Sequence, residues 1–385
     1  MRIALTLLSG IGYGGQTYFR NLLPELVATD SENEYHCFVQ CGHPLIRACT
    51  APNLVFHEVI RAKASAVERF FFEQCRLPIA LRRARIDLLY TAKNLAIFRA
   101  PCRQVIAIRN MEPFRYREFD NGWKQRALSQ LRWELTKRSI AQAHAVVCVS
   151  RAVRDAVVTH LPESAKRIAI IYNGNPVPSA TTEIPPPPAT PPFLLSASKF
   201  VAYANQLTLV EAYAQLIARQ PDAPPLWFAG GIHDTRYFRR VQQRVAALRC
   251  NERIRFLGLV PQPQLHALMR STHLFLFPSL VEACPHTLIE AMACGAPIAT
   301  AYTPPMPEIC GDAATYFDPH DPKNIATVIE QLLTDTALRM HHIAHGYTQA
   351  QRFTWGKTAR QLQAVFASVH QDTTERDGAR CARGA

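Results

Sequence analysis

The sequence has no hydrophobic run that approaches the roughly 18 residues of a membrane-spanning helix. The apolar stretch after Arg2 is too short for a signal-peptide core, and no cleavage motif follows it, so we expect a first strand there. The 11 cysteines form no C-x-x-C pair, and an H-E-x-x-H motif and internal repeats are also missing. These absences argue against a zinc site and favour reduced thiols in a cytoplasm.

Acidic residues are scarce relative to basic ones, with 30 Asp and Glu against 43 Lys and Arg and a formal net charge of +13. The excess is concentrated in residues 61–140, which hold 18 Lys and Arg against 7 Asp and Glu, a net +11. Such a concentration predicts an acidic partner: an anionic membrane surface, a phosphorylated acceptor or nucleic acid. An arginine-rich composition without such a partner is the alternative. No nucleic-acid-binding motif accompanies the charge, so we expect no nucleic acid partner.

A proline-rich segment divides the chain. With 385 residues and 48% hydrophobic content, two domains with separate cores are expected. Residues 173–192 read NGNPVPSATTEIPPPPATPP, a composition that avoids sheet interiors and separates domains semi-rigidly. We therefore predict a first domain over 1–175, a linker over 176–192 and a second domain from 193 to 350. A ligand cleft between two doubly wound domains follows from this arrangement.

The most informative stretch runs from Leu274 to Ile309. It opens with an apolar strand, continues through a loop that carries Glu282 and a helix that carries Glu290, and closes with a second strand. This is a strand–loop–helix–strand unit of a parallel α/β sheet, in which ligands bind beyond the carboxyl ends of the strands. Two carboxylates in such a place suit a ligand with many hydroxyls. The structural alternatives are a capping box with Thr287 for Glu290 and a solvated surface charge for Glu282.

This stretch resembles the signature of the retaining glycosyltransferases of family 4. Their pattern P-S-x-x-E followed by E-A-M-A-x-G-x-P stands here as Pro278-Ser279, Glu282 and 290–297. The resemblance implies the GT-B fold, in which two doubly wound Rossmann-like domains face each other across a cleft. It also implies that Glu282, at the catalytic centre, binds donor-sugar hydroxyls beside the anomeric carbon, and that Glu290 binds the nucleotide ribose.

The chain departs from the family at two places in this domain. Family 4 enzymes have an arginine and a lysine that neutralise the donor diphosphate, and Lys199 and Ala204 stand at those positions. This removes one cation, and lysine lacks the bidentate fork of arginine. The signature loop has Pro285, which has no N–H to donate. Contacts to the ligand are therefore expected from His286 and Thr287.

Two further turns resemble family segments that line the nucleotide pocket. One contains Gly231, after an expected strand over 226–229, and the other contains Val260, after an expected strand over 254–257. The second segment contacts the base through its backbone in the family. The identity of the base is therefore not readable from the side chains.

A glycine-rich turn follows the first expected strand, with glycines at 10, 12, 14 and 15 and a helix expected from about Gln16. Such a turn lets the backbone approach a phosphate. A dinucleotide-binding fold is the rival interpretation, but the spacing G-x-G-x-x-G is absent. Gly14 and Gly15, with Tyr18, instead resemble the start of family 4 enzymes, where this loop lies against the donor diphosphate and faces the acceptor.

The segment after the expected strand 104–108 reads Arg109-Asn110-Met111-Glu112-Pro113-Phe114. Much of family 4 has a histidine beside the reacting sugar here. Some surface-polysaccharide transferases instead have N-x-x-P-F, which Asn110 matches. Because an amide cannot take a proton, the resemblance implies that Asn110 orients sugar hydroxyls. Glu112 is a candidate acceptor-side base.

One further helix is expected over 66–83, bent or broken at Pro78. Its aromatic cluster, Phe70-Phe71-Phe72, lies among arginines. Contact with lipid and packing in a helical core are both consistent with this pattern.

The resemblance extends over nearly the whole chain, including a helix over 351–370 that crosses back to the first domain, and we expect a disordered tail over 371–385. It implies a metal-independent, retaining transfer of a sugar from a nucleotide-sugar donor to a glycan or lipid-linked acceptor in cell-surface polysaccharide or lipopolysaccharide biosynthesis. No cofactor is expected beyond this donor substrate. A cytoplasmic location follows, with a peripheral position at the inner face of the membrane. The alternative, which Ala204 and Asn110 favour, is a catalytically impaired GT-B protein that binds a sugar nucleotide or a polyanion.

Overall fold

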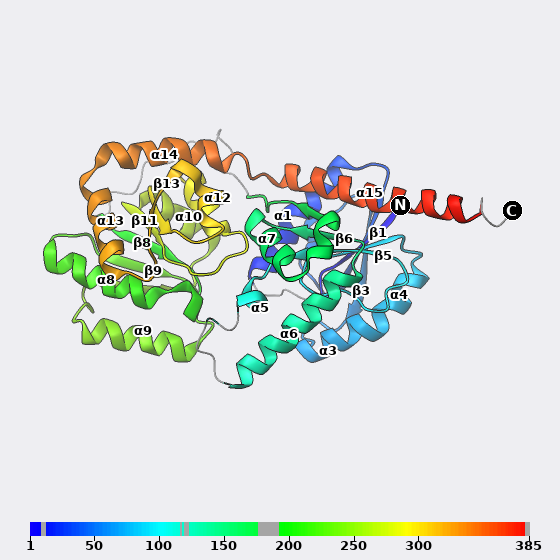
Figure 1. The fold of residues 1–385 in the computed structure, drawn as a ribbon, viewed down its shortest axis with the longest axis horizontal. Helices are drawn as coiled ribbons and strands as arrows, with labels where there is room; N and C mark the ends of the chain where they lie inside the picture. Colours follow the sequence, from blue (N-terminus) through cyan, green and yellow to red (C-terminus); the bar gives the residue numbers. More distant parts are fainter. Residues whose placement is uncertain (9–12, 116–117, 119–122, 176–191, 382–385) are drawn as a thin grey trace. The chain divides into compact units, whose positions relative to one another are not determined.

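The structure is a computed structural model that describes residues 1–8, 13–115, 118, 123–175 and 192–381. The chain divides into two compact units (Figure 1). Unit 1 consists of Met1–Gly174 and Thr354–Ala385, and unit 2 consists of Asn175–Phe353. All of the predicted linker except residue 192 lies outside the described residues.

Unit 1 is built on a seven-stranded parallel sheet in the order β3-β2-β1-β4-β5-β6-β7. Its strands are β1 (Arg2–Thr6), β2 (Glu34–Gln40), β3 (Leu54–Ile60), β4 (Leu88–Thr91), β5 (Arg103–Ile108), β6 (Ala145–Cys148) and β7 (Ile168–Ile170). Every residue of β1 after Arg2 is buried. This burial is typical of a parallel sheet that is covered on both faces.

Helices cover both faces of this sheet. They are α1 (Tyr13–Thr29), α2 (Leu45–Ala48), α3 (Ala66–Phe71), the π-helix η1 (Phe72–Arg76), α4 (Leu77–Arg83), α5 (Glu112–Arg115), α6 (Trp123–Gln142), α7 (Arg151–His160), the 3₁₀-helix η3 (Pro162–Arg167) and α15 (Trp355–Cys381). Because side chains alternate along a strand, Ile3 and Leu5 of β1 pack into a core with α1 and α15, whereas Ala4 packs into a second core with Leu77 and Leu81 of α4.

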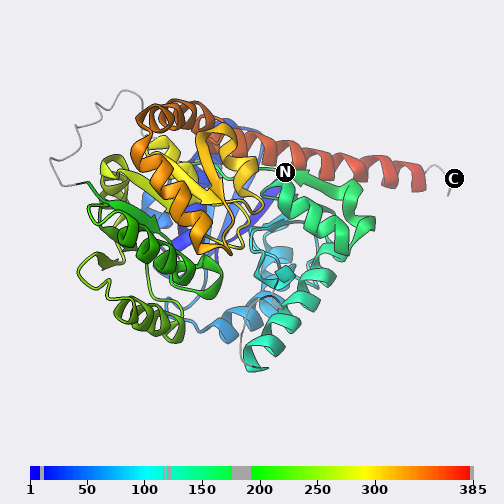
Figure 2. The same ribbon diagram turned by 60° about the vertical axis from the view of Figure 1, so that its left-hand side comes forward.

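The last helix, α15, follows unit 2 in the sequence but packs on unit 1, and Figure 2 shows it in red up to the C-terminus. Its Phe366 ring lies 5.5 Å from the ring of Tyr90, and Nε2 of Gln363 donates to the Leu26 carbonyl over 3.1 Å. The helix continues to Cys381, where the sequence predicted disorder from residue 371. Once packing has formed the first turns of a helix, further residues add to it at little cost in free energy, because each contributes a hydrogen bond.

The helix predicted over 66–83 is interrupted, although not at Pro78. The π-helix lies between α3 and α4, and Pro78 stands in the first turn of α4. The segment stays helical through both junctions, and the π turn, in which the Leu77 N–H bonds to the Phe72 carbonyl, ends just before Pro78, which has no N–H to donate. The interruption therefore comes before the proline.

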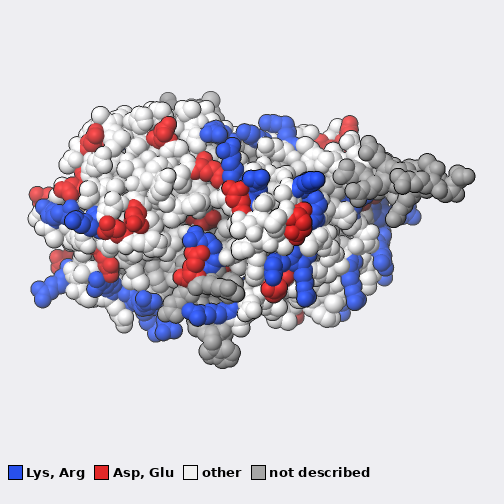
Figure 3. Space-filling view, viewed as in Figure 1, with Lys and Arg blue, Asp and Glu red and all other residues white. Residues whose placement is uncertain are grey.

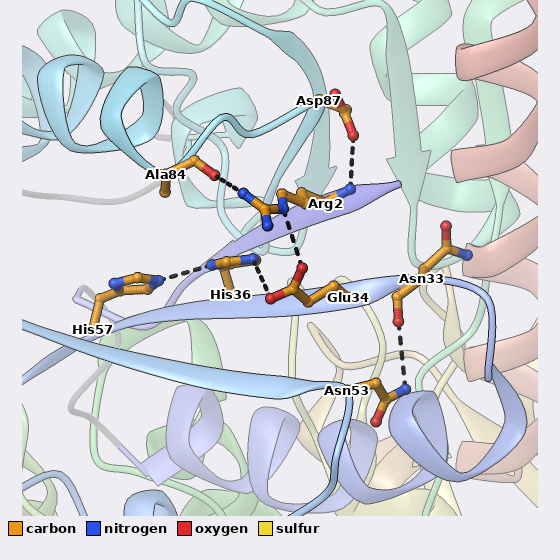
Figure 4. A network of polar contacts seen from close by, with 8 residues as sticks. All are labelled: Arg2, Asn33, Glu34, His36, Asn53, His57, Ala84 and Asp87. Carbon is orange, nitrogen blue, oxygen red and sulfur yellow. Dashed lines mark hydrogen bonds and ion pairs between the residues drawn. The ribbon is translucent and has the colours of Figure 1, made fainter.

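A polar network joins the amino ends of the first strands of unit 1 (Figure 4). Arg2 donates its backbone N–H to Asp87 and its Nε to Glu34, at 2.7 and 3.1 Å. The next inward residue on β2, His36, lies 2.8 Å from His57 between their Nδ1 and Nε2 atoms. Burial lowers the pKa of both imidazoles, which favours their neutral forms.

Unit 2 has a six-stranded parallel sheet in the order β10-β9-β8-β11-β12-β13. Its strands are β8 (Leu194–Ala197), β9 (Leu226–Ala229), β10 (Ile254–Gly258), β11 (Leu274–Phe277), β12 (Ile298–Ala301) and β13 (Ala314–Phe317). Its helices are η4 (Ala202–Ala204), α8 (Gln206–Arg219), α9 (Thr235–Ala247), α10 (Gln262–Ser271), α11 (His286–Ala293), α12 (Met306–Cys310), η5 (Gly311–Ala313), α13 (Pro322–Thr334) and α14 (Thr336–Ala350). The α/β class and the strand–helix order predicted from the sequence are confirmed. Within the described part of the chain, no helix has the length and apolar character that a membrane crossing requires.

Candidate functional site

The strand order of unit 2 places a switch point between β8 and β11. The chain moves from β8 toward β9 and β10 on one side, and from β11 toward β12 and β13 on the other. The loops after β8 and β11 therefore lead to opposite sides of the sheet, and ligands of such sheets bind at this point, beyond the carboxyl ends of the strands. Lys199 follows β8, and Glu282 follows β11.

Asn205 joins the two loops that flank this switch point. Its Nδ2 donates to the carbonyls of Pro278 and Pro319, at 3.2 and 2.8 Å. Its backbone is left-handed, with φ 61° and ψ 30°, a conformation that Asn tolerates better than most residues. The N–H of Leu280 adds a bond of 2.8 Å to the Tyr203 carbonyl. No role was predicted for Asn205 from the sequence. An Asn before a helix start is a usual signal for an N-cap, but the Asn205 side chain makes no cap hydrogen bond to α8.

Glu282 is half-buried in the β11–α11 loop. The Ser279 hydroxyl donates to its Oε1 over 2.9 Å. Burial raises the pKa of Glu282 to about 7, and the Ser279 bond and the charge of Lys199 act in the opposite direction. Near neutral pH this carboxyl group can therefore both accept and donate hydrogen bonds.

Lys199 is exposed, and its Nζ lies 5.1 Å from the centre of the Tyr203 ring. Its backbone carbonyl accepts a 3.0 Å bond from Nε2 of Gln206, which fixes the turn between β8 and α8. Ala204 is 2% exposed at the end of η4. The methyl group of Ala204 is therefore packed inside unit 2 and carries no charge.

Glu290 does not cap its helix, so the capping-box interpretation is wrong. Helix α11 begins at His286, its N-cap Pro285 makes no side-chain bond, and Glu290 lies in its second turn. The Glu290 Oε1 accepts a 3.0 Å bond from Nε2 of Gln262 in α10 and lies 3.7 Å from Nε2 of His266. At 9% exposure, this carboxylate is held by a neighbouring helix.

His286 and Thr287 form the first turn of α11 and are both partly buried. The N–H groups of a first turn lie outside the i→i−4 ladder of their helix, and the positive end of the helix dipole is there. This location has the chemistry expected of a diphosphate site.

The two glycine turns at the carboxyl ends of β9 and β10 adjoin the same edge of the sheet. Gly231 accepts a 2.9 Å bond from the N–H of Phe200, and the neighbouring Gly230 donates to the Gly258 carbonyl over 2.7 Å. Gly230 has φ +151°, and a Cβ added there would lie 1.9 Å from the Ser198 carbonyl oxygen. Val260 is partly buried just beyond Gly258.

In unit 1, Gly14 and Gly15 lie within helix α1, which begins at Tyr13. The sequence had placed the helix start near Gln16, so this expectation is corrected. The N–H groups of a first turn have no partner within the helix, so glycine destabilises the helix less there than in its interior. The preceding turn, 9–12, lies outside the described residues.

Asn110 is exposed at the carboxyl end of β5, where Asn94 holds its backbone. The Asn94 side chain accepts from the Asn110 N–H over 3.2 Å and donates to its carbonyl over 2.7 Å. The Asn110 Oδ1 accepts from the N–H of Glu112 over 2.9 Å. Glu112 itself lies 3.6 Å from Arg132, between Oε1 and Nη1. Asn94 was not predicted from the sequence, although a polar residue soon after a strand is a signal for this edge.

Arg109 covers a buried tyrosine pair next to Asn110. Its guanidinium carbon lies 3.7 Å from the centre of the Tyr18 ring, and the Tyr18 and Tyr90 hydroxyls are 2.6 Å apart. The pair joins α1 to β4 at the carboxyl edge of the sheet. This contact was not predicted, because it joins residues from three distant segments.

Two α/β units with parallel sheets and central switch points define the GT-B fold. Over 97% of its length, the chain is similar to the sucrose-phosphate synthase of Thermosynechococcus elongatus, with a TM-score of 0.74, 20% identity and 100% of that chain covered. HepE of Anabaena in complex with UDP gives a TM-score of 0.71 at 17% identity and covers 96% of this chain and 100% of its own.

Two family models match the sequence: Glycosyltransferase Family 4 over residues 13–176 and Glycosyl transferases group 1 over residues 180–349. The chain belongs to the group 1 glycosyltransferases of family 4. The resemblance seen in the sequence is therefore confirmed.

Curated relatives from Escherichia coli match shorter stretches. The serotype-specific mannosyltransferase WbdA is 30% identical over 185 residues, which are 48% of this chain and 23% of WbdA. The O-antigen chain mannosyltransferase B is 36% identical over 108 residues, 28% of each chain. The chain thus spans about a quarter of the length of these relatives.

Proposed function

We propose that the protein is a glycosyltransferase that binds a nucleotide sugar at the switch point of unit 2. The observation that carries this proposal is the arrangement of Lys199, Glu282 and Glu290 on the loops and helix beyond β8 and β11. Glu282 binds the sugar hydroxyls and Glu290 the ribose. Gly231 and Val260 line the nucleotide pocket.

The transfer proceeds with retention and without a metal ion. Lys199 and the first turn of α11, with His286 and Thr287, stabilise the diphosphate as it leaves. The reacting sugar carries oxocarbenium-like charge in the transition state. The departing phosphate oxygen accepts the acceptor proton, so no protein base is required in this proposal.

The acceptor binds unit 1, near Gly14, Gly15 and Asn110, and is a glycan or a lipid-linked glycan of a cell-surface polysaccharide. The named activities of the mannosyltransferase relatives support this class of acceptor. The reaction takes place at the cytoplasmic face of the membrane. The resemblance of N-x-x-P-F to surface-polysaccharide transferases agrees with this.

The second candidate function is binding of a sugar nucleotide or a polyanion without transfer. The burial of Ala204, at a position where the family has a lysine, favours it. An enzyme that lacks this cation stabilises the leaving diphosphate less well.

A thermal-shift screen with UDP, GDP, ADP, CDP and dTDP tests the proposal, because a ligand that binds only the folded state raises the melting temperature. We expect one nucleotide to stabilise the protein and its sugar derivatives to be hydrolysed or transferred. Stabilisation without turnover of any such sugar would favour the second candidate. No stabilisation by any nucleotide would contradict both sugar-nucleotide proposals.

A further inference from the structure

We propose that one side of unit 1, formed by α3, the π-helix, α4 and α6, binds the surface of an anionic lipid bilayer. We call it the α3–α4 surface. The inference rests on the proposed function in one respect: a lipid-linked acceptor explains why the protein would need to bind a membrane. The binding itself is a property of unit 1.

Large apolar side chains are exposed on these helices. They are Val67 at 78%, Phe70 at 41%, Phe71 at 58% and Ile79 at 51% on α3 and α4, and Leu128 at 42% and Leu131 at 55% on α6. Among the described residues, this is where most of the strongly exposed large hydrophobic side chains of unit 1 occur. Such a group of apolar side chains marks an interaction site.

The π-helix keeps these side chains on one side. Val67, Phe71 and Ile79 are spaced by multiples of four residues, and a regular α-helix would rotate Ile79 away from Val67 by roughly 120°. The wider turn of the π-helix takes up much of this rotation. The opposite side carries Leu77 and Leu81, which are fully buried against the sheet. In α4 the segment therefore has one buried apolar side and one exposed side, whereas no residue of α3 is buried.

The charge around the apolar side chains is positive. Arg76, Arg82 and Arg83 are exposed on the same segment. Its two acidic residues are both neutralised: Glu68 pairs with Arg61 and the buried Glu73 with Lys93, each at 2.5 Å. Figure 3 shows blue side chains with white surface between them over α4 and little red there.

This combination fits a bilayer surface. Amphipathic helices with aromatic and aliphatic side chains on one side and Arg or Lys beside them bury the apolar side chains at the boundary between headgroups and acyl chains. Each basic residue near an anionic surface contributes about a five-fold gain in affinity. The α3 and α6 helices lie side by side in Figures 1 and 2, so that both can contact one surface.

The α3–α4 surface is also connected to the edge of the sheet that carries Asn110. Glu73 of the π-helix is 1% exposed and binds Lys93, which follows β4. The next residue, Asn94, holds the backbone of Asn110. A bilayer on this surface therefore lies on the unit that we propose to bind a lipid-linked acceptor.

Vesicle flotation of the full chain tests the proposal. Vesicles of phosphatidylcholine alone are compared with vesicles that also contain phosphatidylglycerol, at low and at high salt. We expect the protein to float with the anionic vesicles at low salt, and much less at high salt because salt screens the attraction. Absence of flotation with anionic vesicles at low salt would overturn the proposal.

Two double variants locate the surface. Phe70→Ser with Phe71→Ser removes apolar contacts, and Arg82→Gln with Arg83→Gln is expected to weaken binding about 25-fold. Their controls lie on unit 2: Met340→Ser, as exposed as Phe71 at 58%, and Arg239→Gln with Arg240→Gln, a second exposed arginine pair. Equal flotation of the test and control variants would overturn the proposal. The arginine variant keeps the test valid even if the Phe70/Phe71 variant fails to fold.

Two further measurements separate this proposal from others. Light scattering without vesicles detects self-association, and a dimer that the Phe70/Phe71 variant loses would show that a second copy of the chain covers the surface instead. Nucleotide binding is measured without lipid. Flotation without nucleotide binding would contradict the proposed function alone, and nucleotide binding without flotation would contradict the lipid surface alone.

Discussion

Nε2 of Gln262 in α10 donates a 3.0 Å hydrogen bond to Oε1 of Glu290 in α11. The bond fixes one oxygen of the carboxylate that we propose to bind the ribose. A carboxylate held in one orientation before the ligand arrives has less rotational freedom to lose on binding.

Replacing Gln262 should therefore weaken nucleotide binding with little effect on folding. For Gln262→Ala we expect a dissociation constant for the selected nucleoside diphosphate about ten-fold higher, the scale of one hydrogen bond to a charged group. Isothermal titration calorimetry measures it. The control is Gln264→Ala, an exposed glutamine on the same helix, which should bind as the wild type does. Equal affinity of the two variants would show that the Gln262 contact is not used.

Glu282 should make folding stability depend on pH. Its pKa rises from 4.5 to about 7 on folding, so the folded state prefers the neutral form. This contribution is fully present below about pH 4.5 and is lost as the pH rises to about 7, by an amount on the order of 3 kcal/mol. The free energy of unfolding of the Glu282→Gln variant should not fall in this way over the same pH range. Urea unfolding at about pH 5 and pH 8 measures the difference, and the exposed Glu252→Gln should follow the wild type.

Asn205 should stabilise unit 2 by two separable effects. Asn205→Gly keeps the left-handed backbone accessible but loses the two bonds that the side chain donates and the 2.7 Å bond that it accepts from the Thr208 hydroxyl. Asn205→Ala loses the same bonds and also disfavours the left-handed backbone. We expect destabilisation of about 1–3 kcal/mol for the glycine variant and about 1 kcal/mol more for alanine. Urea unfolding of both variants checks the order. An alanine variant as stable as the glycine variant would show that the backbone conformation is unimportant.

The two adjacent glycines after β9 should differ sharply in how much stability is lost when each is replaced by alanine. Gly230→Ala places a Cβ 1.9 Å from the Ser198 carbonyl oxygen, and we expect a loss of roughly 2–4 kcal/mol. Gly231→Ala meets its nearest atom, Cδ1 of Leu259, at 3.9 Å and should fold normally. Thermal unfolding of both variants compares them. Similar melting temperatures would contradict this steric account.

The strands, the two doubly wound sheets and the position of Glu282 were predictable because each depends on local sequence. Apolar runs such as Leu274–Phe277 specify buried strands by themselves. A loop that directly follows a parallel strand lies at the carboxyl edge wherever the strand is in the sheet. The fold class therefore followed from hydrophobic patterning together with the family signature.

The contacts that orient the site were not predictable, because they join residues far apart in the sequence. The Gln262–Glu290 bond and the Asn205 bonds to Pro278 and Pro319 depend on how separate elements pack. The sequence left the capping-box alternative for Glu290 open for the same reason. A capping box and a second-turn glutamate share one local pattern, and only the observed helix start at His286 distinguishes them.

The central claim is that Glu282 and Glu290 bind the sugar nucleotide. Calorimetric titration of the nucleotide sugar chosen by the thermal-shift screen into the wild type, Glu282→Gln with Glu290→Gln, and Glu252→Gln tests it most directly. We expect the double variant to bind at least about 100-fold more weakly, the loss of two hydrogen bonds to charged groups, and Glu252→Gln to bind normally. Unchanged affinity in a folded double variant would contradict the account.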